Sequence, residues 1–338
     1  MSNRWPGGLI RKTPVTPSSA AAPGVWTLAE AGFWTKQGLW PIPPPLPETL
    51  AIFALGFAGS NLTTRNKYTY SGCVVSAGGA ATTASSFGSA AGNSTAGIFA
   101  LGYSPSFATL TTRDKYTYSG CVVSAGGAAT VGSAVGSAAG NSTVGIFALG
   151  CAGGRVATRD KYTYSGDVVS AGGAATLPSR AGSSTGNSTV GIFALGGIAG
   201  CQRVTTRNKY TYSGCVVSTG GAATVASNGG SAAGNGTVGI FALGCACGVG
   251  RTATRDKYTY SGDVVSAGGA ATVASAYGSA AGNSTVGIFA LGYDAAVTYL
   301  TTRNKYTYAG CVVSAGGAAT VAAYAGSAAS NGTTGVNM

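Results

Sequence analysis

The sequence predicts an all-β protein in which six copies of one four-stranded unit are arranged radially as a β-propeller behind an extended arm. Two observations carry this prediction. A tract reading Asn or Asp followed by KYTY starts at residue 66 and recurs at 114, 160, 208, 256 and 304, with spacings of 48, 46, 48, 48 and 48 residues. A second tract, IFALG, precedes each copy of the first. Repetition at such a period is typical of solenoids and propellers.

Each unit contains four short stretches typical of β-strands. In one unit they read GSAAG, GIFALG, KYTYS and VVSAG, and no helical periodicity links them. The turn GNST predicts a tight hairpin between the first two strands, and YSG followed by Cys or Asp predicts one between the last two. GIFALG is apolar on both faces, which is typical of a strand covered by neighbouring sheets. The alternation in KYTYS places Tyr68 and Tyr70 on one face, where we expect them to pack.

The two ends of the repeat region complement each other. The first unit begins at its second strand, at Ala51, whereas the C-terminal GSAAS and NGTTG supply only a first strand and a hairpin turn. Joining them makes one sheet from both termini and removes the unpaired edges that a linear array would leave. We therefore expect residues 50–338 to form a closed ring of six blades, with residues 1–49 as a separate arm.

The differences between units fall on one face of the predicted disc. Strand direction alternates within a blade, so connections 2–3 and 4–1 share the face opposite connections 1–2 and 3–4. The 1–2 and 3–4 turns are nearly identical between units, whereas the 2–3 loops differ, as in YSPSFATL and CAGGRVA. The 4–1 stretches also differ, carrying Phe87, Val135, Arg180, Asn228, Tyr277 and Tyr324. Loops on a rigid frame often bind ligands, so we interpret this face as a recognition surface, with neutral drift as the alternative.

Basic and aromatic residues are expected on the same face. Twelve of the 20 basic residues open the third strands, as Arg65 and Lys67 do, and we expect them to form a basic rim. The candidate ligand-binding residues are Tyr103, Phe107, Arg155, Arg203, Arg251, Tyr293 and Tyr299. Because arginine forms paired hydrogen bonds with carboxylates and aromatic rings stack on sugars, the predicted ligand is an acidic glycan. The basic residues form a ring and no nucleic-acid motif is present, which argues against nucleic acid as the ligand. Pairing of the repeated Arg and Lys within their own blades stays open.

Composition argues against catalysis and against a metal or cofactor. The chain has no histidine and eight carboxylates, which removes the commonest general base and the commonest metal ligand. Cys245 and Cys247 lack the second cysteine pair of a zinc site. Four of the eight cysteines share a repeated position with Asp, so free thiols are expected. Six Asn-Ser-Thr or Asn-Gly-Thr tracts are interpreted as turns, and the net charge of +12 suits an anionic partner.

The first 49 residues are a different kind of segment. All four tryptophans, Trp5, Trp26, Trp34 and Trp40, lie there with nine of the eleven prolines. TLAE from residue 27 is a capping-box pattern and predicts a short helix near 27–37, between extended Pro-rich stretches. Tryptophans are good anchors, so we expect these four to dock the chain to a partner. No stretch of about 18 apolar residues and no secretory signal is present, so we expect no membrane insertion and synthesis in a cytoplasm.

The repeat region resembles the kelch family of β-propellers. The resemblance lies in the apolar strand ending in glycine, as in residues 145–150, in the Tyr-bearing third strand at Tyr162 and Tyr164, and in VVSAG. Two features depart from the family: the apolar strand ends in a double glycine only at Gly196 and Gly197, and the tryptophan of the fourth strand is absent. The resemblance therefore implies the propeller fold and not a kelch function.

The arm resembles an N-terminal segment that recurs on structural proteins of tailed bacteriophages. Its specific part is VWTL followed by WTKQGLWP, and the KYTYSG and NST tracts likewise resemble repeats of phage virion proteins. The resemblance implies a tail or appendage protein of the virion, made in the host cytoplasm and held by other virion proteins through residues 1–49. An adhesin for host glycans is our first interpretation, a structural decoration protein the second, and a propeller enzyme the last. Whether copies of the chain associate in the particle stays open.

Overall fold

A computed structural model describes residues 28–37, 49–332 and 335–336, and its contacts divide the chain into two compact units, 1–48 and 49–338. In the first unit, helix α1 (Leu28–Lys36) lies within the predicted range 27–37. The ring of Trp34 on this helix contacts Phe33 edge to face, with 5.1 Å between centroids. Trp5, Trp26, Trp40 and the Pro-rich stretches lie outside the described residues. No described helix is long and apolar enough to cross a membrane.

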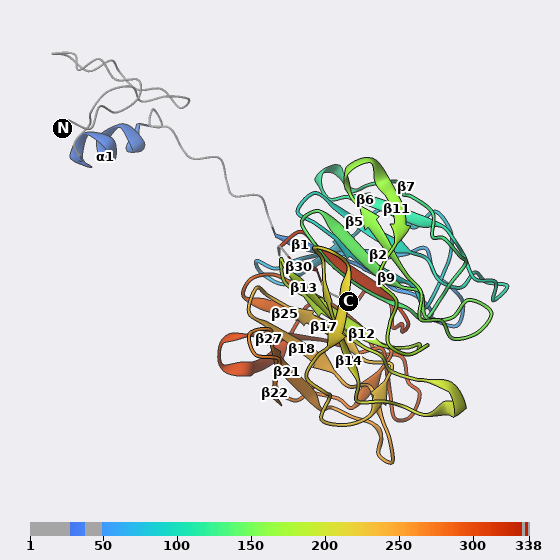
Figure 1. The fold of residues 1–338 in the computed structure, drawn as a ribbon. Helices are drawn as coiled ribbons and strands as arrows, with labels where there is room; N and C mark the ends of the chain where they lie inside the picture. The colour runs from blue at the N-terminus through green and yellow to red at the C-terminus, as the bar shows by residue number, and fades with distance from the viewer. Residues whose placement is uncertain (1–27, 38–48, 333–334, 337–338) are drawn as a thin grey trace, which may run out of the picture. The chain divides into compact units, whose positions relative to one another are not determined.

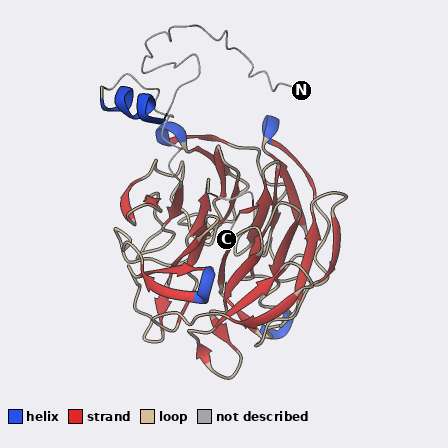
Figure 2. Ribbon diagram, turned by 90° about the vertical axis from the view of Figure 1, so that its left-hand side faces the viewer, coloured by secondary structure: helices blue, strands red, loops and turns tan. Residues whose placement is uncertain are grey.

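The regular structure of the second unit is mostly β-strand, as Figures 1 and 2 show, and the strands form antiparallel sheets. The first sheet contains, in spatial order, β29 (Ser327–Ser330), β1 (Leu50–Ala54), β2 (Arg65–Thr69) and β3 (Val74–Ala77). The second contains β4 (Ser89–Gly92), β5 (Ala96–Ala100), β6 (Arg113–Thr117) and β7 (Val122–Ala125). The third contains β8 (Ser137–Asn141), β9 (Val144–Ala148), β10 (Arg159–Thr163) and β11 (Val168–Ala171).

Three more sheets repeat this pattern. The fourth contains β12 (Ser183–Gly186), β13 (Val190–Ala194), β14 (Arg207–Thr211) and β15 (Val216–Thr219). The fifth contains β17 (Ser231–Gly234), β18 (Val238–Ala242), β21 (Arg255–Thr259) and β22 (Val264–Ala267). The sixth contains β24 (Ser279–Gly282), β25 (Val286–Ala290), β27 (Arg303–Thr307) and β28 (Val312–Ala315). The four predicted strands of each unit are therefore present, and the fold is all-β and propeller-like.

Short elements occupy the connections. The two-residue strands are β16 (Ser227–Asn228), β19 (Cys245–Ala246), β20 (Gly250–Arg251), β23 (Ser275–Ala276), β26 (Tyr293–Asp294) and β30 (Gly335–Val336). The 3-10 helices are η1 (Ser119–Cys121), η2 (Ser165–Asp167), η3 (Ala199–Cys201) and η4 (Ala309–Cys311).

The first sheet joins the two ends of the repeat region, as their complementary sequences predicted. Strand β29 pairs antiparallel with β1, with Ala51 opposite Ser330 and Ala54 opposite Ser327. The innermost strands contact one another in the order β29, β4, β8, β12, β17, β24 and back to β29. Strand β30, which follows β29 in the chain, pairs with β8 as a fifth strand of the third sheet, and Gly335 lies opposite Asn141.

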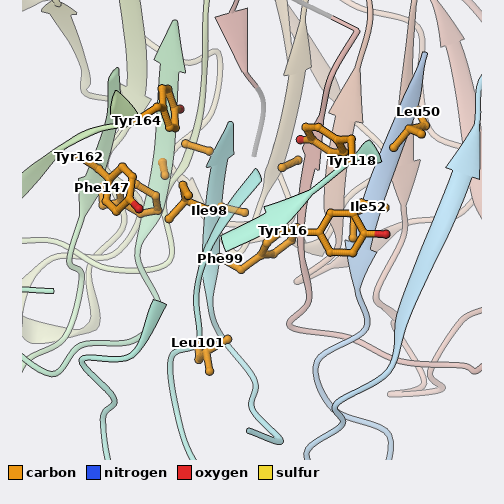
Figure 3. Packing of buried hydrophobic residues seen from close by; sticks show 14 of the residues in the cluster. Leu50, Ile52, Ile98, Phe99, Leu101, Tyr116, Tyr118, Phe147, Tyr162 and Tyr164 are labelled. Atoms are coloured by element: carbon orange, nitrogen blue, oxygen red, sulfur yellow. The ribbon is translucent and has the colours of Figure 1, made fainter. Parts of the chain in front are cut away.

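The core lies between neighbouring sheets because the second strand is apolar on both faces. Figure 3 shows Phe99 of β5 near Tyr116 on the side of Ile52, while Ile98 points toward Phe147 of the next sheet. All five side chains are at most 1% exposed, and burying each contributes roughly 1.5–3 kcal/mol. Repeating the tract IFALG therefore builds the same interface between every pair of sheets.

The arginines that open the third strands lie in these interfaces, which corrects the predicted basic rim. All six, at positions 65, 113, 159, 207, 255 and 303, are at most 1% exposed. Arg65 donates to Asp114 of the next sheet at 2.7 Å, and its guanidinium lies 4.7 Å from the Phe99 ring centroid. In every repeat the arginine is followed by Asn or Asp, and the arginine of one sheet reaches the Asn or Asp of the next sheet. The prediction considered only which face of its own strand the arginine is on, and that does not reveal a contact with another sheet. The open alternative, pairing with the own blade's Asp or carbonyls, was right for the carbonyls, since Arg65 Nη1 donates to the carbonyl of Ala80 at 3.2 Å, but the Asp belongs to the neighbouring sheet.

The constant 1–2 turns are held by their asparagines. Asn141 Oδ1 accepts hydrogen bonds from the backbone N–H groups of Thr143 and Val144 at 2.9 Å, and its Nδ2 donates to the carbonyl of Ser188 at 3.0 Å. These contacts fit the interpretation of the Asn-Ser-Thr tracts as turns. Leu50 begins β1 at the same end of its sheet, where its N–H donates to Asn331 Oδ1 at 2.7 Å.

Candidate functional site

The variable 2–3 loops and 4–1 stretches pair with each other. The paired residues, one pair for each sheet, are Phe57 with Tyr324, Tyr103 with Ser86, Cys151 with Ala134, Gly197 with Arg180, Cys245 with Asn228, and Tyr293 with Ala276. Both sets of variable segments therefore lie on one face, as strand direction predicted.

Six backbone hydrogen bonds tie the 4–1 stretches into one cycle. Phe87 N–H donates to the carbonyl of Ala325, and each later member donates to the one before it at 2.7–2.8 Å. The members are Phe87, Val135, Ala181, Gly229, Tyr277 and Ala325. Their φ angles lie between 52° and 64°, a region that side-chain-bearing residues rarely adopt. Such backbones persist where the surrounding structure fixes them, and they are common at ligand sites.

A depression of about 360 Å³ adjoins this cycle on the variable face, and we call it the aromatic basin. Its lining residues are Phe87, Tyr103, Val135, Arg180, Tyr277, Tyr293, Val297, Tyr299 and Tyr324. The rings support one another: Tyr277 stacks on Tyr293 with 5.7 Å between centroids, and Tyr293 meets Tyr324 edge to face at 5.0 Å. The basin is thus walled by aromatic side chains that are already packed in place.

The electrostatics of the aromatic basin combine neutral phenols with one cation. Burial raises the pKa of Tyr103, Tyr277 and Tyr324, so their hydroxyls are protonated at neutral pH and can donate and accept hydrogen bonds. Arg180 is the charged residue in the lining. Asp294 follows Tyr293, but its Oδ1 accepts the N–H of Thr298 at 2.8 Å within its own loop.

The predicted ligand residues are distributed unevenly about the basin. Tyr103, Tyr293 and Tyr299 line it, whereas Phe107 is 79% exposed outside the lining. The Arg251 guanidinium lies 4.4 Å from the Tyr293 ring centroid.

The other two predicted arginines lie in the variable loops outside the basin lining. Arg203 Nε donates to Asn228 Oδ1 at 3.0 Å and its Nη1 to the carbonyl of Ala246 at 3.4 Å. Arg155 is half-buried, and its backbone bridges Cys151.

The basin also contains residues that were not among the predicted ligand residues. Phe87, Arg180, Tyr277 and Tyr324 come from the 4–1 stretches, which vary between units as the 2–3 loops do. Their variation between units was the sequence signal that could have identified them as candidate ligand residues. Residues 87 and 324 are neighbours only because the sixth sheet adjoins the first and the first adjoins the second.

The arrangement suits binding by stacking and hydrogen bonding. Within the described part of the chain, no three or more Cys, Asp or Glu side chains group closely enough to hold a metal ion. The cysteines whose side chains are described carry free thiols, and of these Cys151 is buried and Cys247 exposed. The chain matches no protein-family model and no curated protein sequence.

Proposed function

We propose that the aromatic basin binds a carbohydrate and that the chain is a virion adhesin of a tailed bacteriophage, attaching to acidic glycans of the host surface. The observation that carries the proposal is a cavity of about 360 Å³ walled by five tyrosines, one phenylalanine, two valines and one arginine. Small-molecule sites occupy about 300–1,000 Å³ and combine apolar walls with a few polar groups. The basin has both properties.

The walls match the two kinds of surface on a sugar ring. The C–H face of a pyranose stacks on aromatic rings, and its hydroxyls bond to groups that both donate and accept, as neutral phenols do. Tyr277 and Tyr293 are stacked with an interplanar angle of 7°, so they form a rigid platform. A platform ordered before binding loses little side-chain entropy when the sugar arrives.

The preference for an acidic glycan rests on the loop arginines alone. Arg180 lines the basin, and Arg203 and Arg251 lie in neighbouring loops. The six strand arginines are buried and are not available to a ligand. A single guanidinium beside stacked rings suits one carboxylate on a sugar better than an extended polyanion.

The proposal includes a closed six-bladed propeller of the kelch type. Three contacts support it, and each joins the sixth sheet to the first. The N–H of Ala325 donates to the carbonyl of Tyr277 in the backbone cycle, Arg303 Nη2 donates to Asn66 Oδ1 at 3.0 Å, and β24 contacts β29.

Attachment to the particle is assigned to residues 1–49, whose VWTL and WTKQGLWP tracts resemble a segment of phage structural proteins. The N–H of Leu50 bonds to Asn331 of a constant 1–2 turn, so the chain enters the sheets on the face opposite the basin. An adhesin anchored through its first residues requires this placement of the binding face.

A structural decoration protein is the second candidate. The favouring observation is a set of exposed valines at equivalent positions of the outer strands, each 56–57% exposed: Val74, Val122, Val168, Val216, Val264 and Val312. Such valines would suit burial against neighbouring virion proteins. On this alternative the aromatic basin binds nothing.

Binding of the full-length protein to acidic and neutral glycan arrays, and its adsorption to host cells, tests the proposal. Tyr293→Ala and Tyr324→Ala should each weaken binding about tenfold, the equivalent of one lost stacking contact. Arg180→Gln should weaken binding to acidic glycans and leave neutral ones unchanged. Phe107→Ala, outside the basin, is the matched control. Unchanged adsorption of both tyrosine variants would leave decoration as the better account, and hydrolysis of a bound glycan would indicate an enzyme.

A further inference from the structure

Two junctions between neighbouring sheets hold a carboxylate between a lysine and a tyrosine. Asp167 lies in the turn between β10 and β11, and Lys115 of the preceding sheet donates to both of its oxygens at 2.9 Å. The hydroxyl of Tyr162 donates to Asp167 Oδ1 at 2.6 Å. Asp263 has the same two kinds of partner, Lys209 at 3.0 Å and Tyr258 at 2.6 Å.

The equivalent position in the other four sheets is a cysteine with the same backbone. Cys73, Cys121, Cys215 and Cys311 have φ of 55–56°, as the two aspartates do at 55°. Asp tolerates this left-handed region well, whereas Cys is not favoured there. Each cysteine carbonyl packs against a glycine of the preceding sheet, such as Gly79 against Cys121, just as Gly127 packs against Asp167. The cysteine therefore replaces Asp in an otherwise unchanged frame.

The partners of the carboxylate are retained around these cysteines. In the sheet before each cysteine, a lysine occupies the strand position that Lys115 has in the sheet before Asp167. The pairs are Lys305 with Cys73, Lys67 with Cys121, Lys161 with Cys215 and Lys257 with Cys311. Tyr68, Tyr116 and Tyr210 are fully buried, and their hydroxyls have no hydrogen-bond partner of ordinary geometry. Burial, and next the thiol beside each hydroxyl, raises their pKa. Tyr306, the tyrosine beside Cys311, is equally buried, and its hydroxyl accepts the N–H of Gly269 at 3.5 Å. A buried hydroxyl without an acceptor costs free energy. At the other two junctions Asp167 and Asp263 supply that acceptor as an anion, and the cysteine junctions lack it.

We propose that these four junctions are oxidation sites, at which hydrogen peroxide converts the cysteine to a sulfinate held by the lysine and the tyrosine. The sulfur attacks one peroxide oxygen, the O–O bond breaks, and sulfenic acid and water form. A second peroxide adds another oxygen in the same way, giving sulfinic acid and a second water, and loss of one proton leaves the sulfinate. In each step the sulfur is oxidised by two electrons and one peroxide is reduced.

The product resembles the aspartate that it replaces. A sulfinate carries two oxygens and one negative charge, so it can accept the lysine ammonium and the tyrosine hydroxyl as the carboxylate of Asp167 does. Charge-assisted hydrogen bonds of this kind are stronger than neutral ones. Oxidation would therefore add an ionic link between neighbouring sheets at four junctions, in addition to the two that Asp167 and Asp263 already provide.

Peroxide titration of the full-length protein, with mass spectrometry of each cysteine-bearing peptide, tests this proposal. We expect two added oxygens at Cys73, Cys121, Cys215 and Cys311, and a higher melting temperature after oxidation. Lys67→Met should slow sulfinate formation at Cys121 about tenfold, the loss of one hydrogen bond to a charged group, and leave the other three sites in the same molecule unchanged. Lys115→Met, which faces Asp167, is the matched control and should leave all four sites unchanged.

A second variant separates product stabilisation from reactivity. Cys121→Asp should raise the melting temperature without peroxide, because it supplies the anion directly. The proposal is overturned if Lys67→Met oxidises like the parent at Cys121, if oxidation stops at one added oxygen, or if exposed Cys247 is oxidised to sulfinate before the four junction cysteines.

Discussion

The ten arginines of the second unit form two groups with opposite surroundings. Six open the third strands and are buried between sheets, each over a phenylalanine ring of the next sheet, as Arg113 is over Phe147 at 4.6 Å. The other four lie in the variable loops, where Arg251 stacks on Tyr293 at 4.4 Å and Arg180 lines the aromatic basin. The first group holds the sheets together, and the second lies on the variable face, where we propose that a ligand binds.

The buried group contains a further division. Arg65, Arg113 and Arg207 donate to an aspartate of the next sheet at 2.7 Å, whereas the other three donate to an asparagine at 3.0–3.1 Å. Burial without a counter-charge lowers the pKa of Arg159, Arg255 and Arg303 to about 10. Those three arginines are therefore still charged at neutral pH, and the side chain that accepts their hydrogen bond is a neutral asparagine. Arginines at the same position of the repeat therefore differ in how strongly they stabilise the contact between sheets, because some donate to Asp and others to Asn.

The largest expected effect comes from removing an arginine that has a buried anionic partner. Arg207→Met leaves the carboxylate of Asp256 buried without its cation, which should cost about 3–5 kcal/mol of unfolding free energy. Arg251→Met in a loop should change it by no more than about 0.5 kcal/mol. Chemical denaturation of both variants measures the difference.

A second substitution shows whether the buried charge is the cause. Asp256→Asn in the Arg207→Met background should recover part of the loss, because no buried charge is then left unpaired. Equal losses for Arg207→Met and Arg251→Met would show that the two groups of arginines do not differ in the way their burial indicates.

The next effect has the opposite sign. Asn208→Asp gives Arg159 the acceptor that Arg113 already has, and should raise the unfolding free energy by about 1–2 kcal/mol. The site accommodates the change because Thr176, which accepts from Asn208 Nδ2 at 2.8 Å, can rotate its hydroxyl to donate, as Thr130 does to Asp160 at 2.6 Å. A lower denaturation midpoint for Asn208→Asp would mean that the desolvation of the new carboxylate exceeds the gain from pairing.

The sequence predicted the parts of the fold that depend on repetition. Aligned copies of IFALG and KYTY gave the four strands, and the complementary ends at Ala51 and GSAAS gave the shared first sheet. Placing Arg65 and its five counterparts in a basic rim was wrong, because alternation along a strand does not show that the next sheet covers them. The pattern Arg-Asn or Arg-Asp in every unit contained the signal, since a buried arginine needs an acceptor at a fixed distance.

The variable face was predicted from the unequal loops, but only part of the aromatic basin was. Tyr103, Tyr293 and Tyr299 come from the loops that carried the prediction. Tyr277 and Tyr324 come from short 4–1 stretches, and only the cycle of backbone hydrogen bonds brings residues so distant in sequence together. These contacts join residues of different repeats, so the sequence of a single repeat does not predict them.

The smallest expected effect concerns the partly exposed counterpart of the buried ion pairs. The side chains of Lys115 and Asp167 are 28% and 32% exposed. Burial opposes ionisation of Asp167, but the hydrogen bonds from Tyr162 and Lys115 outweigh it and lower its pKa. A carboxyl whose pKa is lower in the folded state stabilises the protein above the pKa of the unfolded chain, about 3.9, and loses that contribution as pH falls through the folded value.

Asp167→Asn should therefore be less stable than the parent at neutral pH, by no more than about 1 kcal/mol because solvent screens the pair. The difference should shrink as pH falls below about 4, and melting curves of the two proteins across that range measure it. A difference that stayed constant into strong acid would show that the charge on Asp167 does not stabilise the junction.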